Sequence, residues 1–212
     1  MSHKFLIIIA ILFFLFSCED KTVDYGLDEY FVEIATAQNK DEFLLDNGNM
    51  LFSTPDNERK LFDFGDRVLI NYSLLPQIEN ERGYTVEINH STKIPLGKLT
   101  QTSDSVIRSS ASAPILLESI WLGSHYLNMQ FYINFKSVTH TIGLLVDSTK
   151  LENDIVRMYF IHDTKNDSPG YPSHTYLSFD LKEVLGIPEN ARQISVQINS
   201  SNYGNKTYNF VY

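Results

Sequence analysis

The only cysteine of this chain, Cys18, follows directly on an unbroken apolar run from residue 5 to residue 16. The run is shorter than the roughly 20 apolar residues that a helix needs to cross the hydrocarbon core of a bilayer. Lys4 precedes the run and the small Ser17 ends it, a pattern that is typical of a secretory signal peptide. Because one cysteine permits no disulfide within the chain, the exported part must be held together by its hydrophobic core.

The four residues that end in Cys18 resemble a lipobox, although Phe16 is bulky for its position. They predict that residues 1–17 are removed as a lipoprotein signal peptide and that Cys18 becomes the lipidated N-terminus. The polar residues 18–29 then form a lipidated tether to the membrane. Two alternatives stay open, namely a secretory signal with an incidental cysteine and an uncleaved N-terminal anchor.

The formal net charge of the chain is −9, and this balance disfavours two kinds of partner. Nucleic acids and anionic lipid headgroups are both bound through clustered lysines and arginines. No second hydrophobic stretch approaches membrane-spanning length, so the lipid is the expected link to the membrane. The acidic Glu19 and Asp20 resemble the surface-export signal of Bacteroidetes lipoproteins. They favour an outer-membrane protein exposed on the cell surface, with a periplasm-facing protein as the alternative.

The part of the chain that follows the tether has the alternating pattern of β-strands. Apolar and polar residues alternate over residues 68–74 and 84–88, which indicates strands with one buried and one wet face. The segment Asp46-Asn47-Gly48-Asn49 predicts a hairpin turn, because Asn-Gly readily adopts positive φ angles. Five short strands within residues 30–100 suffice for a small barrel.

Residues 101–114 are mostly small and polar, which predicts a Ser-rich linker and a domain boundary, with a long loop inside a single domain as the alternative. Residues 115–212 again have β character, most clearly where apolar residues alternate from Leu127 to Phe135. A short helix is expected after Asp180, ending before Gly186. Several antiparallel strands with one short helix favour a β-sandwich.

Several segments resemble the NigD-like family of Bacteroidetes lipoproteins. They are Tyr30-Phe31-Val32-Glu33, Phe43-Leu44-Leu45-Asp46-Asn47-Gly48, Gly65-Asp66-Arg67-Val68, Asn71-Tyr72, Tyr126-Leu127-Asn128-Met129 and His140-Thr141-Ile142-Gly143-Leu144. The resemblance implies an all-β protein with an N-terminal OB-like barrel followed by a C-terminal antiparallel β-sandwich. It implies no activity and no site residues. Within the third segment, we expect Asp66 and Arg67 to form an ion pair at the barrel edge, which is of little net worth if exposed.

Residue patterns that support catalysis or metal binding are missing from the sequence. Six histidines occur, but none has the spacing of a metal motif, and His140 is expected to be structural. His162 and Asp163 are neighbours on a predicted strand, so their side chains point to opposite faces. There is no nucleophile elbow, no Gly-rich phosphate loop and no free nucleophilic cysteine. We therefore expect no catalytic residues, no metal, no cofactor and no enzymatic activity.

The aromatic side chains of Trp121, Tyr126 and Tyr132 cluster in one stretch and are the candidate ligand contacts. Tyr126 and Tyr132 should share the strand face opposite Leu127 and Met129. Such a face could stack on sugars, but cross-strand aromatic packing explains the same pattern and is the favoured interpretation.

Ser105 is a candidate for O-glycosylation, because Asp104-Ser105-Val106 resembles the acceptor motif of Bacteroidetes glycoproteins. The prediction fails if the intact mass of the natively expressed protein shows no added hexose.

The sequence thus favours a non-catalytic binding module that is anchored in the envelope and recognises a glycan, a peptide or an envelope protein. One alternative is a structural or protective envelope component, linked to bacteriocins by the family name alone. The other is a hydrolase whose site has no recognisable motif.

Overall fold

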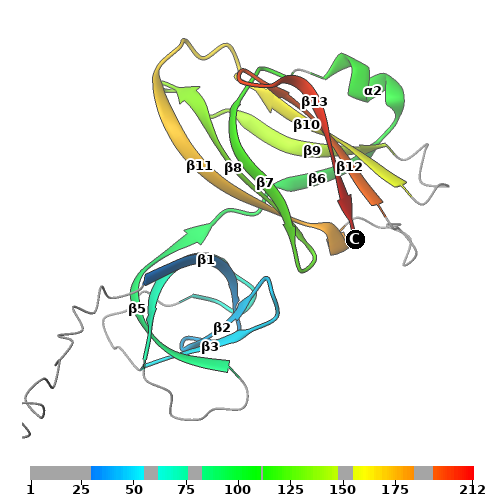
Figure 1. The fold of residues 1–212 in the computed structure, drawn as a ribbon. Coiled ribbons are helices and arrows are strands. Elements are labelled where there is room, and N and C mark those ends of the chain that lie inside the picture. The colour runs from blue at the N-terminus through cyan, green and yellow to red at the C-terminus, as the bar shows by residue number, and fades with distance from the viewer. Residues whose placement is uncertain (1–29, 55–61, 76–82, 111, 148–154, 184–192) are drawn as a thin grey trace, which may run out of the picture.

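The computed structural model describes residues 30–54, 62–75, 83–110, 112–147, 155–183 and 193–212. The predicted signal peptide, Cys18 and the tether lie outside the described residues. Nearly all described segments are strands, and they form two bodies that lie one above the other (Figure 1). No helix among the described residues has the length and apolar character needed to cross a bilayer.

The first body is a closed five-stranded barrel with the strand order β1-β2-β3-β5-β4. β3 and β5 are parallel and the other pairs are antiparallel, as in an OB-type barrel. The fold class that the sequence predicted is therefore confirmed. The strands are β1 (Tyr30–Ala37), β2 (Glu42–Leu45), β3 (Met50–Ser53), β4 (Arg67–Leu74) and β5 (Gly83–Ile94).

The predicted hairpin turn lies between β2 and β3 and is confirmed. Gly48 has a φ of 90°, a left-handed conformation that glycine adopts without steric cost. The Asn47 side chain accepts a hydrogen bond of 2.9 Å from the Asn49 backbone N–H. The turn fixes the register so that Phe43 and Leu51 face each other inside the barrel.

The second body is a sandwich of a five-stranded sheet, β13-β12-β10-β9-β6, and a three-stranded sheet, β11-β8-β7. Most neighbours are antiparallel as expected, but β10–β12 and β6–β9 are parallel pairs. The strands are β6 (Lys98–Thr102), β7 (Leu116–Gly123), β8 (Tyr126–Phe135), β9 (Thr141–Asp147), β10 (Ile155–Asp163), β11 (Tyr171–Asp180), β12 (Gln193–Ser200) and β13 (Gly204–Val211).

The segment that was expected to be a linker, residues 101–114, belongs to the sandwich. Its first residues complete β6, which pairs with β9, and helix α2 (Asp104–Ser109) follows. The chain instead passes between the two bodies at residues 95–97, where the Gly97 backbone N–H donates to the Ser178 carbonyl. Small polar residues suit an edge strand and a short exposed helix as well as a linker, so composition could not separate these cases. The helix expected after Asp180 is a 3₁₀ turn, Leu181–Glu183, and the residues after it lie outside the described ones.

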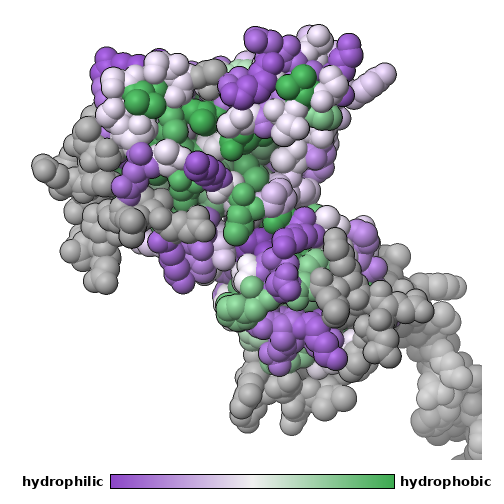
Figure 2. Space-filling view, turned by 180° about the vertical axis from the view of Figure 1, so that it is seen from behind, coloured by the Kyte–Doolittle hydropathy of each residue, from purple (hydrophilic) through white to green (hydrophobic). Residues whose placement is uncertain are grey.

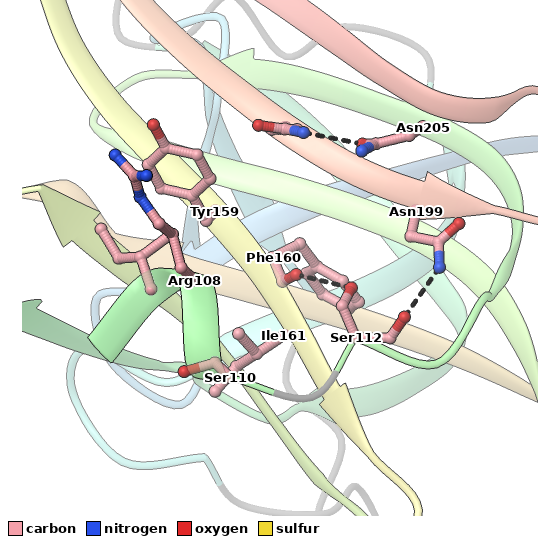
Figure 3. Close-up of a pocket in the computed structure, with 10 residues that line it drawn as sticks. Arg108, Ser110, Ser112, Tyr159, Phe160, Ile161, Asn199 and Asn205 are labelled. Atoms are coloured by element: carbon pink, nitrogen blue, oxygen red, sulfur yellow. Dashed lines mark hydrogen bonds between the residues drawn. The ribbon is translucent and has the colours of Figure 1, made fainter. Parts of the chain in front are cut away.

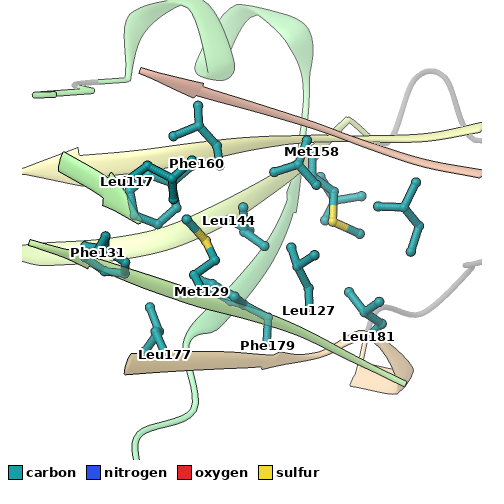
Figure 4. Close-up of a cluster of buried hydrophobic side chains, with 14 of the residues drawn as sticks. Leu117, Leu127, Met129, Phe131, Leu144, Met158, Phe160, Leu177, Phe179 and Leu181 are labelled. Carbon is teal, nitrogen blue, oxygen red and sulfur yellow. The ribbon is translucent and has the colours of Figure 1, made fainter. Parts of the chain in front are cut away.

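The main hydrophobic core fills the space between the two sheets of the sandwich (Figure 4). Phe131 of β8 packs edge-on against Phe160 of β10, with 5.6 Å between the ring centroids, and so joins the two sheets. Seen from behind, hydrophobic residues also reach the surface in the middle of the sandwich face, with polar residues around them (Figure 2). The alternation from Leu127 to Phe131 reflects this burial, because every second side chain points into the core.

A buried arginine joins the barrel to the sandwich. Arg67 of β4 binds Asp46 through both terminal nitrogens, at 2.7 and 2.8 Å, and donates to Asn128 of β8 at 3.1 Å. Its guanidinium also lies 4.0 Å from the ring centre of Tyr126. The expected Asp66–Arg67 pair is therefore wrong, since Asp66 binds Lys93 instead, at 2.6 Å. Asp66 precedes β4 and faces Lys93 of β5, whereas Arg67, the first residue of β4, points toward Asp46 and the sandwich.

Gly123 allows the two bodies to approach this closely. A Cβ atom at this position would come within 2.3 Å of the Asp46 Oδ2 atom. The glycine therefore leaves room for the carboxylate that holds Arg67.

Candidate functional site

A polar groove lies between helix α2 and the outer face of the five-stranded sheet (Figure 3). Its volume is about 490 Å³, which is within the range of small-molecule sites. The lining residues come from α2, the segment that follows it, and strands β10, β12 and β13. They are Ile107, Arg108, Ser110, Ser112, Tyr159, Phe160, Ile161, Gln197, Asn199 and Asn205.

The floor of the groove follows from the alternation of β10 and β12. Val156, Met158 and Phe160 of β10 are buried, so Tyr159 between them points to the outer face. On β12, Gln197 and Asn199 point outward in the same way. The parallel register places Tyr159 beside Gln197, and the antiparallel register places Asn199 beside Asn205.

Hydrogen bonds hold the amide side chains of the groove in place. Asn199 Nδ2 donates to the Ser112 carbonyl at 2.7 Å, and Gln197 Nε2 donates to Asn205 Oδ1 at 2.9 Å. These bonds use one group of each amide. Among the described residues, Asn199 Oδ1, Gln197 Oε1, Asn205 Nδ2 and the Tyr159 hydroxyl have no hydrogen-bond partner. The groove therefore offers both donors and acceptors that are oriented and uncommitted.

Arg108 forms the charged rim of the groove next to Tyr159 (Figure 3). Asp104, four residues earlier on α2, accepts hydrogen bonds from the guanidinium and holds the pKa of Arg108 above its usual value. The positive charge is thereby paired within the helix. Among the described residues that line the groove, none carries a carboxylate or an imidazole.

The three aromatic residues singled out from the sequence do not form a common surface. Tyr126 and Tyr132 do share a face of β8, but Tyr126 is only 5% exposed because the barrel and Arg67 cover it. Tyr132 stacks on His174 of β11, with ring centroids 4.6 Å apart. Trp121 is partly buried on β7, opposite Asn128. This arrangement is cross-strand packing, the interpretation that the sequence favoured.

Ser105 lies on an exposed face in the first turn of α2, not in a linker. Its hydroxyl is 3.0 Å from that of Ser103. The exposure leaves the serine accessible to a modifying enzyme, and O-glycosylation stays a prediction.

The histidines include one pairing that the sequence did not suggest. His140 and His162 lie side by side, with 2.8 Å between Nδ1 of the former and Nε2 of the latter. His162 and Asp163 point apart as expected, and Asp163 binds Lys165. No group of three or more metal-binding side chains occurs within the described part of the chain.

Sequence reasoning missed the groove, although part of the signal was present. Polar Gln197 and Asn199 alternate with apolar Val196 and Ile198, which marks an outer sheet face. Such faces are usually only solvated. What makes this one a groove is α2, and the sequence does not indicate that α2 lies beside β10 and β12.

Comparison with known proteins gives one family match and several similar folds. Residues 98–212 match the family model described as the NigD-like C-terminal beta sandwich domain. None of the curated proteins is similar to the chain in sequence.

Several solved structures, among them three from Bacteroides species, resemble the barrel and the sandwich together. A protein of unknown function from Bacteroides vulgatus has 23% identity and a TM-score of 0.72, covering 87% of this chain and 91% of its own. A NigD-like immunity protein from Bacteroides caccae has 21% identity and a TM-score of 0.60, covering 88% and 98%. A Bacteroides fragilis protein described as a putative lipoprotein has 12% identity and a TM-score of 0.61, covering 87% and 96%. At these identities the likeness concerns the fold.

Proposed function

The chain belongs to the NigD-like family, and we propose that it is a lipid-anchored envelope protein that binds a ligand in the groove beside α2 without catalysing a reaction. The ligand is neutral and rich in hydroxyl groups, as a glycan segment is. The observation that carries the proposal is the set of side-chain amide groups around the Tyr159 ring that have no hydrogen-bond partner among the described residues.

The chemistry of the groove supports this ligand class. Side-chain amides pair a donor with an acceptor, and this combination matches neighbouring hydroxyl groups of a sugar. The Tyr159 ring adds a surface that is apolar on its face and polar at its hydroxyl. Among the described residues of the lining, Arg108 is the one that is charged, and Asp104 neutralises it. The groove would therefore offer a strongly charged ligand little opposite charge.

The lining also favours binding over catalysis. Hydrolysis of glycosides usually requires two carboxyl groups on either side of the scissile bond. The described lining has none, so a hydrolase would need its catalytic groups elsewhere.

Replacing Asn199 by alanine is expected to weaken ligand binding by about two- to tenfold, which is the effect of losing one hydrogen bond of roughly 0.5–1.5 kcal/mol. Neutral glycans retained by the mature protein on an array would be titrated by calorimetry against the wild type and Asn199→Ala. The matched control is Asn134→Ala, since Asn134 is an exposed asparagine on β8, away from the groove. If both variants bind like the wild type, or if the array retains no neutral glycan, the groove is not a glycan site.

Lipid anchoring is the second part of the proposal, and the Bacteroides fragilis protein of the same fold, described as a putative lipoprotein, supports it. Cys18→Ser is expected to move the protein from the membrane fraction to the soluble fraction, because the acceptor thiol is lost. Ser17→Ala keeps a small residue before the cysteine and should leave the protein in the membrane. A Cys18→Ser protein that stays membrane-bound and unprocessed would identify residues 5–16 as an uncleaved anchor.

Protease treatment of intact cells tests on which side of the outer membrane the protein lies. Cleavage on whole cells supports the export signal at Glu19 and Asp20, whereas cleavage only after lysis indicates a protein that faces the periplasm.

A protective role is the second candidate, and the NigD-like immunity protein from Bacteroides caccae favours it. A deletion strain that becomes sensitive to a bacteriocin, and regains resistance with the Asn199→Ala protein, would support protection independent of the groove.

A further inference from the structure

A chain of three titratable side chains lies at the end of the sandwich, outside the groove lining. His140 stands just before β9, and its Nδ1 is 2.8 Å from Nε2 of His162 at the end of β10. On its other side, His140 Nε2 is 3.4 Å from Asp167 Oδ2. His162 Nδ1 is 3.2 Å from the Ala113 carbonyl oxygen. The side chains of His140 and Asp167 are each only 2% exposed, so water does not separate them.

The partners of these nitrogens determine where protons lie. A carbonyl oxygen can only accept, so His162 Nδ1 carries the hydrogen toward Ala113. Asp167 accepts backbone N–H groups from Lys136 and Ser137 as an ionised carboxylate. Its negative charge favours a hydrogen on His140 Nε2. The two facing nitrogens then share one more hydrogen, because two bare lone pairs would repel each other. With three hydrogens on their four nitrogens, the two rings together carry one positive charge beside the Asp167 carboxylate.

The pair has no room for a further proton. Both facing nitrogens would then be N–H donors at 2.8 Å, and the two rings would carry like charges in a buried site. The titratable groups around His162 are His140, Asp167 beyond it, and Asp163 on its own strand. Asp163 points away and is paired with Lys165, so it gives little relief.

We infer that His140, His162 and Asp167 form a hydrogen-bonded clasp that fastens residues 136–140 to the end of β10. The clasp opens in acidic medium, when the two histidine rings take up one proton more than their facing nitrogens can share. Asp167 holds the backbone of Lys136 and Ser137, and His140 ends the same segment. The clasp also borders the groove, because His162 holds Ala113 and the neighbouring Ser112 lines the groove wall. The inference goes beyond the proposed function and does not depend on any ligand.

The direction of the pH effect follows from linkage. Burial lowers the pKa of His162 in the closed state, so the opened or unfolded state binds the extra proton more readily. His162 therefore contributes its full stabilisation of the closed state above the ordinary histidine pKa of about 6.5, and this contribution is lost as the pH drops below that value.

Hydrogen exchange of the mature protein tests the clasp directly. After correction for intrinsic rates, protection of the amides of residues 136–140 should be several-fold lower at about pH 5 than at about pH 7.5, because the opened state takes up the extra proton more readily. His162→Gln cannot take up the proton, so its protection in this segment should not depend on pH. His90→Gln removes an exposed histidine that hydrogen-bonds to Thr92 on the barrel, and it should behave like the wild type.

The inference fails if His162→Gln keeps the full pH dependence or if the wild type shows none. Should His162→Gln not fold, NMR titration of the wild-type ring protons gives the answer alone. Coupled titration of the two rings, with His162 resisting the last proton, supports the clasp, whereas two independent titrations near the ordinary value overturn it.

Discussion

Replacing Arg67 by alanine is expected to lower the free energy of unfolding by about 3–5 kcal/mol, the usual cost of removing one partner of a buried ion pair. The side chain of Arg67 is fully buried, and it donates hydrogen bonds to both Asp46 and Asn128. Among the described residues, the Asp46 carboxylate then keeps only Asn128 as a side-chain donor, at 2.9 Å. Urea denaturation measures the loss, with circular dichroism following both bodies and Trp121 fluorescence following the sandwich.

Lys93→Ala provides the matched control, because it removes a cation from the half-exposed pair with Asp66. This loss should be within about 1 kcal/mol, as for other surface ion pairs. A second variant, Arg67→Met with Asp46→Leu, removes both charges and should recover part of the stability. If Arg67→Ala costs no more than Lys93→Ala, water reaches the junction and Arg67 does not hold the two bodies together.

Phe131→Ala is expected to lower the free energy of unfolding by a comparable amount, about 3–5 kcal/mol. The ring is fully buried, contacts Phe160 across the sandwich and lies between the two sheets (Figure 4). The cavity left behind cannot close fully, because strands β8 and β10 are fixed by their own ladders. Thermal and urea unfolding of the variant give the change.

Phe135→Ala is the control on the same strand, since this ring is 38% exposed. It removes the same atoms from a site where water can replace them, and the change should stay below about 1 kcal/mol. Equal losses in the two variants would mean that the inter-sheet contact of Phe131 contributes nothing beyond its strand propensity.

Local pattern was sufficient wherever a strand or turn depends on neighbours in sequence. The alternation through Val68 and Ile70 and through Leu127 to Phe131 predicted which faces are buried, because successive side chains of a strand point to opposite sides. The Asn47-Gly48 turn followed from the φ angle that glycine permits. The resemblance of short segments to the NigD-like family supplied the order of barrel and sandwich.

Composition was a poor guide where pairing is distant in sequence. Residues 101–114 have the small polar residues of a linker, yet Gln101 and Thr102 pair with Val146 and Asp147 of β9. The hydrogen bonds of that ladder come from the backbone and leave no trace in residue type. Arg67 was assigned to its neighbour Asp66 for the same reason, because its actual partner lies 21 residues away.

By itself, then, the sequence determined the all-β class, the main strand faces, the Gly48 turn and the lipobox prediction at Cys18, since each depends on residues within a few positions of one another. Tertiary structure alone decided the rest. It buried Tyr126 beneath the barrel, placed α2 beside Tyr159 to make a groove, and brought His140 against His162. These contacts join residues from different strands and different sheets, and only the packing of the complete chain specifies which of them meet.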